Sequence, residues 1–341
     1  MNQEYINAIC QLQERHRNTN YVNNPEFVNG FGLFSGALYH LMPHLDYQKH
    51  ADLYRDYLFQ SHWAALDMSY FLDDDPFVVD GLDQLLANLR QGSPSIIASF
   101  HYGSYRLLPY LLQKHDIPFC LLVRRKVRTQ QIPFFQSLNG THRSQQLAIK
   151  LLDAEDPLAA LKVRRMLRDG CHVLSYLDGI QAIQHAEQHK CPSISIMAGK
   201  IKIREGLPRL AAKFKTDMIA VFTARNGMTG HTIHAQKWTA AQLGDGSPVS
   251  VMQDLFCWFE GILNKDPMAW ENWGSMHHLL QLKADRVNDP NPQFDPEKSS
   301  LLAFGTSYFV LDKNTLKSYK IDEKLFKRLR QQWLATITSD S

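Results

Sequence analysis

A histidine follows an apolar run that has the length and composition of a buried strand. The run begins at Ser95, continues as Ile-Ile-Ala-Ser-Phe and reaches His101, after which the chain turns through Gly103 into a second apolar segment. In α/β proteins the carboxyl ends of strands present reactive side chains to a crevice. Because imidazole gains and loses a proton near neutral pH, His101 is a candidate base at such a strand end.

The middle of the chain alternates segments with strand and helix patterns. Helices are expected at residues 80–90, 156–168 and 207–214, and strands at 95–101, 119–123, 171–177 and 218–223, with a hairpin at 194–203. Asp80 is expected to cap the first helix, and Pro157 to occupy the first position of the second. The alternation predicts an α/β fold with a mainly parallel central sheet that is flanked by helices and is mixed because of the hairpin.

The chain is expected to form one large domain and a small extension. Residues 1–282 form the α/β domain, whose first part, about residues 1–75, is helical; in it the apolar segment 31–42 is predicted to be a buried helix. Residues 283–299 carry three prolines and few apolar side chains, which indicates a linker. Residues 300–341 are expected to form a C-terminal extension with a hairpin at 308–321 and a basic helix capped by Asp322.

The composition is that of a globular protein with a full core. The chain has 341 residues, of which 44% are hydrophobic and 21% charged, and its formal net charge is +3. So small a charge does not indicate a nucleic-acid partner. No run is long enough to cross a membrane and the N-terminus lacks the pattern of a signal peptide, so a cytoplasmic location is expected.

Several kinds of site are disfavoured because their motifs are missing from the sequence. The five cysteines are widely spaced and never form Cys-x-x-Cys, which indicates neither a disulfide framework nor a zinc site. The sequence has no Gly-x-Gly-x-x-Gly after a strand, no phosphate-binding loop, no His-Glu-x-x-His and no Gly-x-Ser-x-Gly. The sequence therefore disfavours four classes of protein: dinucleotide oxidoreductases, phosphate-loop NTPases, zinc proteases and ordinary serine hydrolases.

The landmarks around the histidine resemble the lysophospholipid acyltransferase superfamily, most closely its branch of bacterial lipid A late acyltransferases. In that branch a strand leads into His-Phe-Gly-Asn-Trp-Glu, where this chain has His-Tyr-Gly-Ser-Tyr-Arg at residues 101–106. A Leu-x-x-Gly helix end and an aspartate after a strand are matched by residues 167–170 and by Asp178. A Gly-x-x-x-Leu-Ala helix and a closing Pro-x-x-Trp element correspond to residues 206–211 and 267–270.

The resemblance implies a glycerolipid acyltransferase-like fold and an acyltransferase. Such an enzyme moves an acyl chain from an acyl-carrier-protein or coenzyme A thioester to an amine or hydroxyl of a small molecule or lipid, without a metal ion or other cofactor. His101 would be the general base, and backbone amides at the Gly103 turn would stabilise the oxyanion. The protein would work in the cytoplasm, with a peripheral contact to the inner membrane as the alternative and no transmembrane span.

Several positions depart from the family's pattern, among them Ala220 and His277–His278, and one departure lies in the histidine motif itself. The fifth residue after the histidine is acidic in the family, where it orients the imidazole and stabilises its protonated form. Here it is Arg106, a permanent cation. We expect Asp178 to supply the carboxylate instead. Arg106 would keep His101 neutral, hold an anionic part of a substrate, or form a salt bridge within its helix.

Two groups of residues complete the predicted site. The first follows the histidine directly and is expected to bind substrate: Gly103, Ser104 and Tyr105. The second follows the strand at 119–123 and, by analogy with the family, faces the phosphate-bearing part of the donor: Arg124, Arg125 and Arg128. A solvated basic loop is the competing interpretation of these arginines.

Two other functions stay open for such a chain. One is a non-catalytic relative that binds acyl-carrier proteins or lipids, and turnover that depends on His101 would exclude it. The other is a thioesterase in which water replaces the acceptor, and release of free acid whatever acceptor is offered would favour it.

Overall fold

The computed structural model describes residues 3–19, 25–70, 77–125, 129, 149–179, 191–282 and 294–338. The chain divides into two units that alternate along the sequence. The first contains Met1–Leu12, Ser61–Ala182 and Arg204–Leu255; the second contains Gln13–Gln60, Ile183–Ile203 and Phe256–Ser341. The domain boundaries expected at residues 282 and 299 stay a prediction, and residues 283–293 of the expected linker lie outside the described residues.

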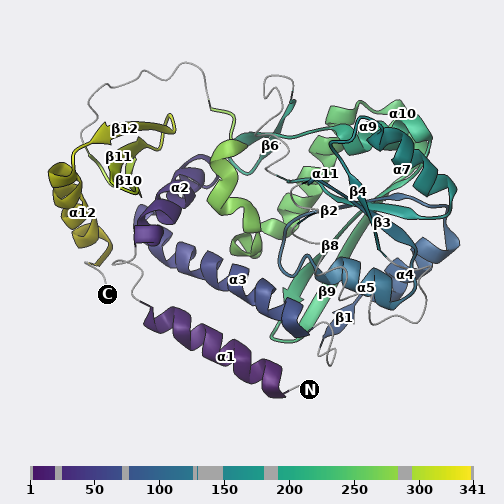
Figure 1. Cartoon of the computed structure of the whole chain (residues 1–341), viewed down its shortest axis with the longest axis horizontal. Helices are drawn as coiled ribbons and strands as arrows, with labels where there is room; N and C mark the ends of the chain where they lie inside the picture. The colour runs from purple at the N-terminus through teal and green to yellow at the C-terminus, as the bar shows by residue number, and fades with distance from the viewer. Residues whose placement is uncertain are drawn as a thin grey trace. The chain divides into compact units, whose positions relative to one another are not determined.

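A mixed sheet of seven described strands forms the centre of the first unit (Figure 1). Its order is β1 (Val78–Asp80), β9 (Gly230–Trp238), β8 (Met218–Asn226), β2 (Ile96–Ser99), β5 (His172–Tyr176), β3 (Phe119–Val123) and β4 (Lys150–Asp153). The strands from β8 to β4 are parallel, whereas β9 is antiparallel to β8, and β1 is parallel to β9. The prediction of a mixed, mainly parallel sheet is confirmed.

The antiparallel pairing in this sheet has a different origin from the predicted one. The hairpin expected at residues 194–203 exists as β6 (Ser193–Ile196) and β7 (Gly199–Lys202), but it forms a separate two-stranded sheet in the second unit. The central antiparallel pair is β8 with β9. The sequence does not indicate β9 because its exposed, polar stretch at Gln236 and Lys237 interrupts the alternation of apolar and polar residues.

Helices cover both faces of the sheet. In Figure 1, α4 (Leu82–Gln91) and α5 (Leu107–Lys114) lie on one face, and α7 (Ala159–Arg168) and α9 (Gly206–Phe214) lie on the other. The leucines that predict α4 also explain its packing, since Leu85, Leu86 and Leu89 recur at helical spacing and are buried.

Two helix starts differ from the prediction. Gly81, with a φ of 80°, is the N-cap of α4, and it makes no side-chain cap; Asp80 is instead the last residue of β1. The left-handed turn out of β1 suits a glycine, which has no Cβ to strain. Pro157 lies before α7, in a turn in which the Asp156 carboxylate accepts a hydrogen bond from the Leu158 N–H (2.8 Å).

Several further elements complete the first unit or are shared between the two. α10 (Ala240–Asp245) belongs to the first unit, and the division falls within three helices: α1 (Gln3–Asn18), α3 (His50–Tyr70) and α11 (Pro248–Leu263).

The second unit is built around an apolar helix. Its elements are α2 (Pro25–Leu41), η2 (Tyr47–Lys49), η5 (Pro267–Ala269), η6 (Glu271–His278), β10 (Ser299–Phe304), β11 (Ser307–Asp312), β12 (Lys317–Ile321) and α12 (Glu323–Thr338). Phe31, Phe34 and Leu38 of α2 are at most 2% exposed, which confirms the predicted buried helix.

The C-terminal segment has one strand more than the predicted hairpin. β10, β11 and β12 form an antiparallel meander, and β10 begins at Ser299, where the sequence indicates a linker. The strand begins with two serines, which are polar and do not suggest a buried strand in the sequence, although both are buried in the structure. The predicted cap of α12 is confirmed, because the Asp322 carboxylate accepts a hydrogen bond from the Leu325 N–H (2.7 Å).

None of the helices in the described part of the chain combines the length and apolar character needed to cross a bilayer.

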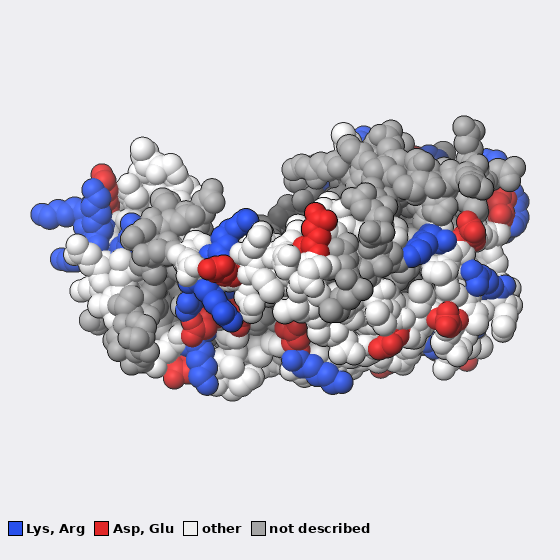
Figure 2. All heavy atoms as spheres, turned by 90° about the horizontal axis from the view of Figure 1, so that it is seen from below, with Lys and Arg blue, Asp and Glu red and all other residues white. Residues whose placement is uncertain are grey.

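On the face shown in Figure 2, described basic and acidic side chains are interspersed and not gathered by sign. This mixture agrees with the small net charge of the chain.

Candidate functional site

His101 and Asp178 follow the ends of two adjacent parallel strands. β2 pairs with β5 so that Ser99 lies opposite Tyr176, and each of the two candidate residues comes two positions later. The chain leaves β2 through α5 toward β3, but leaves β5 toward β8 on the opposite side of β2. Where two adjacent strands are followed by connections in opposite directions, α/β proteins commonly bind ligands at the carboxyl ends of those strands.

The two side chains form a hydrogen-bonded pair. Nδ1 of His101 lies 2.7 Å from Oδ1 of Asp178, whose side chain is fully buried. The same carboxylate accepts the backbone N–H of His101, at 3.0 Å from Oδ2 and 3.2 Å from Oδ1. An ionised carboxylate can only accept, so Nδ1 is the donor to it, and in the neutral imidazole the lone pair is then on Nε2. The pair can therefore take a proton at Nε2 and stabilise the imidazolium that results.

Two tyrosines hold the orientation of the imidazole. The ring of Tyr176 packs against it at a centroid distance of 4.6 Å, and the ring of Tyr105 meets it edge-on at 4.8 Å. The Tyr176 hydroxyl donates to the backbone carbonyl of Tyr105 (3.1 Å), so the two tyrosines that contact the imidazole are hydrogen-bonded to each other. The side chain of His101 keeps 25% of its surface exposed.

The turn after His101 has a conformation that glycine favours. Gly103 has a φ of 53°, and a Cβ built there would lie 3.1 Å from the carbonyl oxygen of Thr223. Ser104 is 1% exposed, and its hydroxyl bonds to Asp67 and Arg225. Its predicted contact with substrate therefore has no support from the geometry.

Arg106 packs on an aromatic ring beside the histidine turn. It is the N-cap of α5, and its guanidinium lies 4.4 Å from the centroid of the Tyr105 ring. Asp178 is the carboxylate that pairs with His101, as the sequence leads us to expect.

The two described arginines of the second predicted group are paired with acidic residues. Arg124 bonds to Glu155 (2.6 and 2.9 Å), and Arg125 bonds to Asp153 (2.9 Å). The hydrogen bond from each arginine lowers the pKa of its carboxyl partner. They follow β3, which neighbours β5, so they lie at the same edge of the sheet as His101. Arg128 lies outside the described residues.

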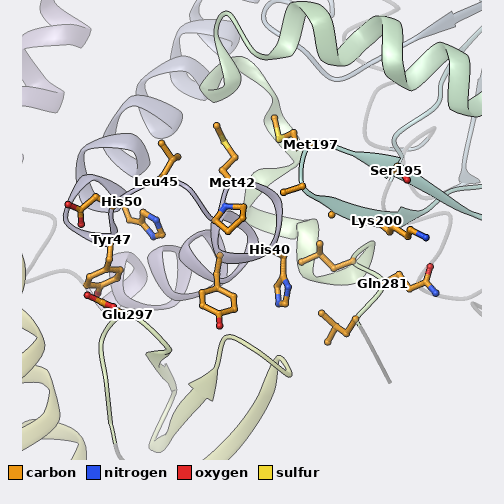
Figure 3. A pocket seen from close by; sticks show the side chains of 17 residues that line it. His40, Met42, Leu45, Tyr47, His50, Ser195, Met197, Lys200, Gln281 and Glu297 are labelled. Atoms are coloured by element: carbon orange, nitrogen blue, oxygen red, sulfur yellow. The ribbon is translucent and has the colours of Figure 1, made fainter. Parts of the chain in front are cut away.

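The second unit contains a cavity of about 740 Å³ (Figure 3). Two of its lining histidines are held by the protein: His50 Nδ1 lies 2.9 Å from the Ser35 hydroxyl, and His40 Nε2 lies 2.7 Å from the carbonyl oxygen of Lys313. Burial lowers the pKa of His50 to about 4, so its ring is neutral near neutral pH. No imidazole–carboxylate pair like that of His101 is formed by the described residues lining this cavity, so the strand-end site is the better candidate for chemistry.

Three residues near His101 could not be recognised from the sequence as parts of the site. Tyr176 reads as an ordinary strand residue, whereas Asp67 and Arg225 are separated from His101 by long stretches of chain. Only the fold brings them to the histidine turn. In the described part of the chain, no group of three or more potential metal ligands is clustered.

No protein-family model matches the chain, and no curated protein matches it either.

Proposed function

We propose that the chain is an acyltransferase that moves an acyl chain from an acyl-carrier-protein or coenzyme A thioester to an amine or hydroxyl. The observation that carries the proposal is the pair of His101 with the buried Asp178, at the point of the sheet where α/β proteins bind ligands. The motif resemblance supplies the reaction class, and the pair supplies a base of the kind that class requires.

In the proposed reaction, Nε2 of His101 accepts the proton of the acceptor as its nitrogen or oxygen attacks the thioester carbonyl. Asp178 stabilises the imidazolium, and backbone amides at the Gly103 turn stabilise the oxyanion of the tetrahedral intermediate. When the intermediate collapses, the C–S bond breaks and the imidazolium returns its proton to the thiolate. The products are an amide or ester and a free thiol, and no acyl-enzyme forms.

Mass spectrometry can test this proposal directly. Octanoyl- and hexadecanoyl-coenzyme A, and the corresponding acyl-carrier proteins, are incubated with a panel of primary amines, alcohols and lysophospholipids. Wild type is expected to give an acylated acceptor, and His101→Ala to give none. His115→Ala, which changes a histidine at the other end of α5, serves as the matched control and is expected to retain activity.

The alternatives give different products. A thioesterase releases free acid at the same rate with every acceptor, and a non-catalytic binding protein retains the thioester intact. Acyl transfer that persists in His101→Ala would overturn the proposed role of the histidine.

A further inference from the structure

A buried ion pair lies against the turn that carries His101. Nη2 of Arg225, on β8, is 2.6 Å from Oδ2 of Asp67, on α3. Asp67 is fully buried, and the side chain of Arg225 is 6% exposed. The hydroxyl of Ser104 joins both charges, because it accepts a hydrogen bond from Arg225 Nη2 (2.8 Å) and donates one to Asp67 Oδ2.

Further contacts fix the pair within the first unit. The Tyr5 hydroxyl donates to Asp67 Oδ1 (2.6 Å), and Trp63 Nε1 donates to the Tyr5 hydroxyl (3.1 Å). The guanidinium of Arg225 stacks over the Trp63 ring at 4.2 Å from its centroid. Both Tyr5 and Trp63 therefore help to immobilise the charges that hold Ser104.

The main chain of the turn is bound to β8 as well. The Thr223 hydroxyl donates to the carbonyl oxygen of Ser104 (3.2 Å), and the carbonyl oxygen of Thr223 lies 3.1 Å from the point that a Cβ of residue 103 would occupy. At the other end of the turn, Asp178 binds both the backbone and the ring of His101. Residues 101–104 are thus held at one end by Asp178 and at the other by Asp67 and Arg225.

The ion pair is a costly way to stabilise a fold. Moving two charges out of water is expensive, and well-packed apolar residues often give equal or greater stability in their place. Arg225 also keeps two buried nitrogens, Nε and Nη1, without a hydrogen-bond partner among the described residues. A role in shape, where two charges and a hydroxyl impose one geometry on the turn, accounts for the pair better than a role in stability does.

We infer that Asp67, Arg225 and Ser104 are positioning residues that hold the His101 turn in its working conformation. They do not touch the reacting atoms; they act through the backbone of residues 101–104. The consequence for catalysis rests on the proposed function, whereas the rigidity of the turn does not.

The test compares two serine variants by amide hydrogen exchange. Ser104→Ala removes the hydroxyl between the charges. Ser99→Ala is the matched control, because the buried Ser99 hydroxyl lies just before the same turn and has no hydrogen-bond partner among the described residues. Exchange of a peptide covering residues 101–106 is expected to become about tenfold faster in Ser104→Ala, from the loss of hydrogen bonds to charged groups. In Ser99→Ala it should keep the wild-type rate, and β5 should be unaffected in both variants.

A double variant separates positioning from stability. Asp67→Leu with Arg225→Met removes both charges, so that neither is left buried alone. The turn should exchange as fast in this variant as in Ser104→Ala, while the sheet keeps its protection. Wild-type exchange of the turn in both variants would overturn the inference.

Turnover adds a second readout. Where acyl transfer is measured, Ser104→Ala is expected to lower kcat about tenfold without raising KM, since the turn is displaced and no substrate contact is lost. If wild type shows no transfer, the proposed function fails, but the exchange result still decides whether these residues position the turn.

Discussion

Nδ1 of His101 lies 2.7 Å from Oδ1 of Asp178, and the two residues come from the ends of different strands. The histidine motif itself, residues 101–106, contains no carboxylate. Here the parallel register of β2 and β5 brings the carboxylate beside the histidine instead. The imidazole therefore has a carboxylate partner although residue 106 is an arginine.

Asp178→Asn tests this replacement. An amide can no longer fix the Nδ1–H tautomer or stabilise an imidazolium, so kcat of the proposed transfer is expected to fall by up to about 10⁴-fold, the effect of the same change in a Ser-His-Asp triad. The control is Asp217→Asn, at the opposite end of the strands, where Asp217 pairs with the exposed Lys237. Steady-state kinetics of acyl transfer measures both variants, and a kcat within twofold of wild type for Asp178→Asn would contradict the role.

Arg106→Met distinguishes anion binding from packing. In the wild type the Arg106 guanidinium lies over the Tyr105 ring, beside the histidine turn. If it holds a phosphate of the donor, KM for a coenzyme A thioester should rise about tenfold, the loss of one charge-assisted contact. KM for an N-acetylcysteamine thioester, which has no phosphate, should not change. Equal effects on both donors would indicate that Arg106 only packs.

Local patterns are sufficient to predict the strands and helices that frame the site. β2, β3 and β5 are short apolar runs bounded by turn residues, and α4 has its leucines at helical spacing. Asp178 is predicted for the same reason as His101, since both follow a buried strand. The sequence cannot give the order of strands, and that order alone places these two residues side by side.

The parts that the sequence does not predict depend on long-range contacts. β9 is polar in its second half, and only pairing along β8 makes it a strand. Asp67 lies within a helix and Arg225 near the end of a strand, and neither has a local pattern that indicates burial. They pair only where α3 and β8 meet in the folded chain.

Gly103→Ala tests how strictly the turn is fixed. Alanine at a φ of 53° is strained, and its Cβ would lie 3.1 Å from the Thr223 carbonyl oxygen. We expect the free energy of unfolding to fall by about 1 to 2 kcal/mol from the backbone alone, and transfer activity to fall as the turn shifts. The control is Gly170→Ala, whose φ is 87° and whose Cβ would meet no atom within 4 Å. Urea unfolding should show a larger loss for Gly103→Ala, and equal losses would mean that the Thr223 contact is accommodated.

The last prediction concerns pH and Lys313 of the second unit. Lys313 is fully buried; its Nζ donates to the carbonyl oxygen of Pro296 (2.6 Å) and lies 4.1 Å from the centroid of the Tyr47 ring. Burial lowers the pKa of Lys313 to about 7, although the charges of Asp295 and Glu297 act in the opposite direction.

In the unfolded chain a lysine has a pKa of about 10.4. Between about pH 7 and pH 10 the unfolded state therefore holds a proton that the folded state has released at Lys313, so the free energy of unfolding should rise with pH. The slope from this one group is at most about 1.4 kcal/mol per pH unit. Below about pH 7 both states are protonated, and Lys313 contributes no slope. Lys313→Met should lose this rise, whereas Lys327→Met, which changes an exposed lysine paired with Glu323, should keep it. Urea unfolding of the three proteins at several pH values between about 6 and 10 measures the difference. A wild-type curve parallel to that of Lys313→Met would show that the buried amine keeps its proton throughout this range.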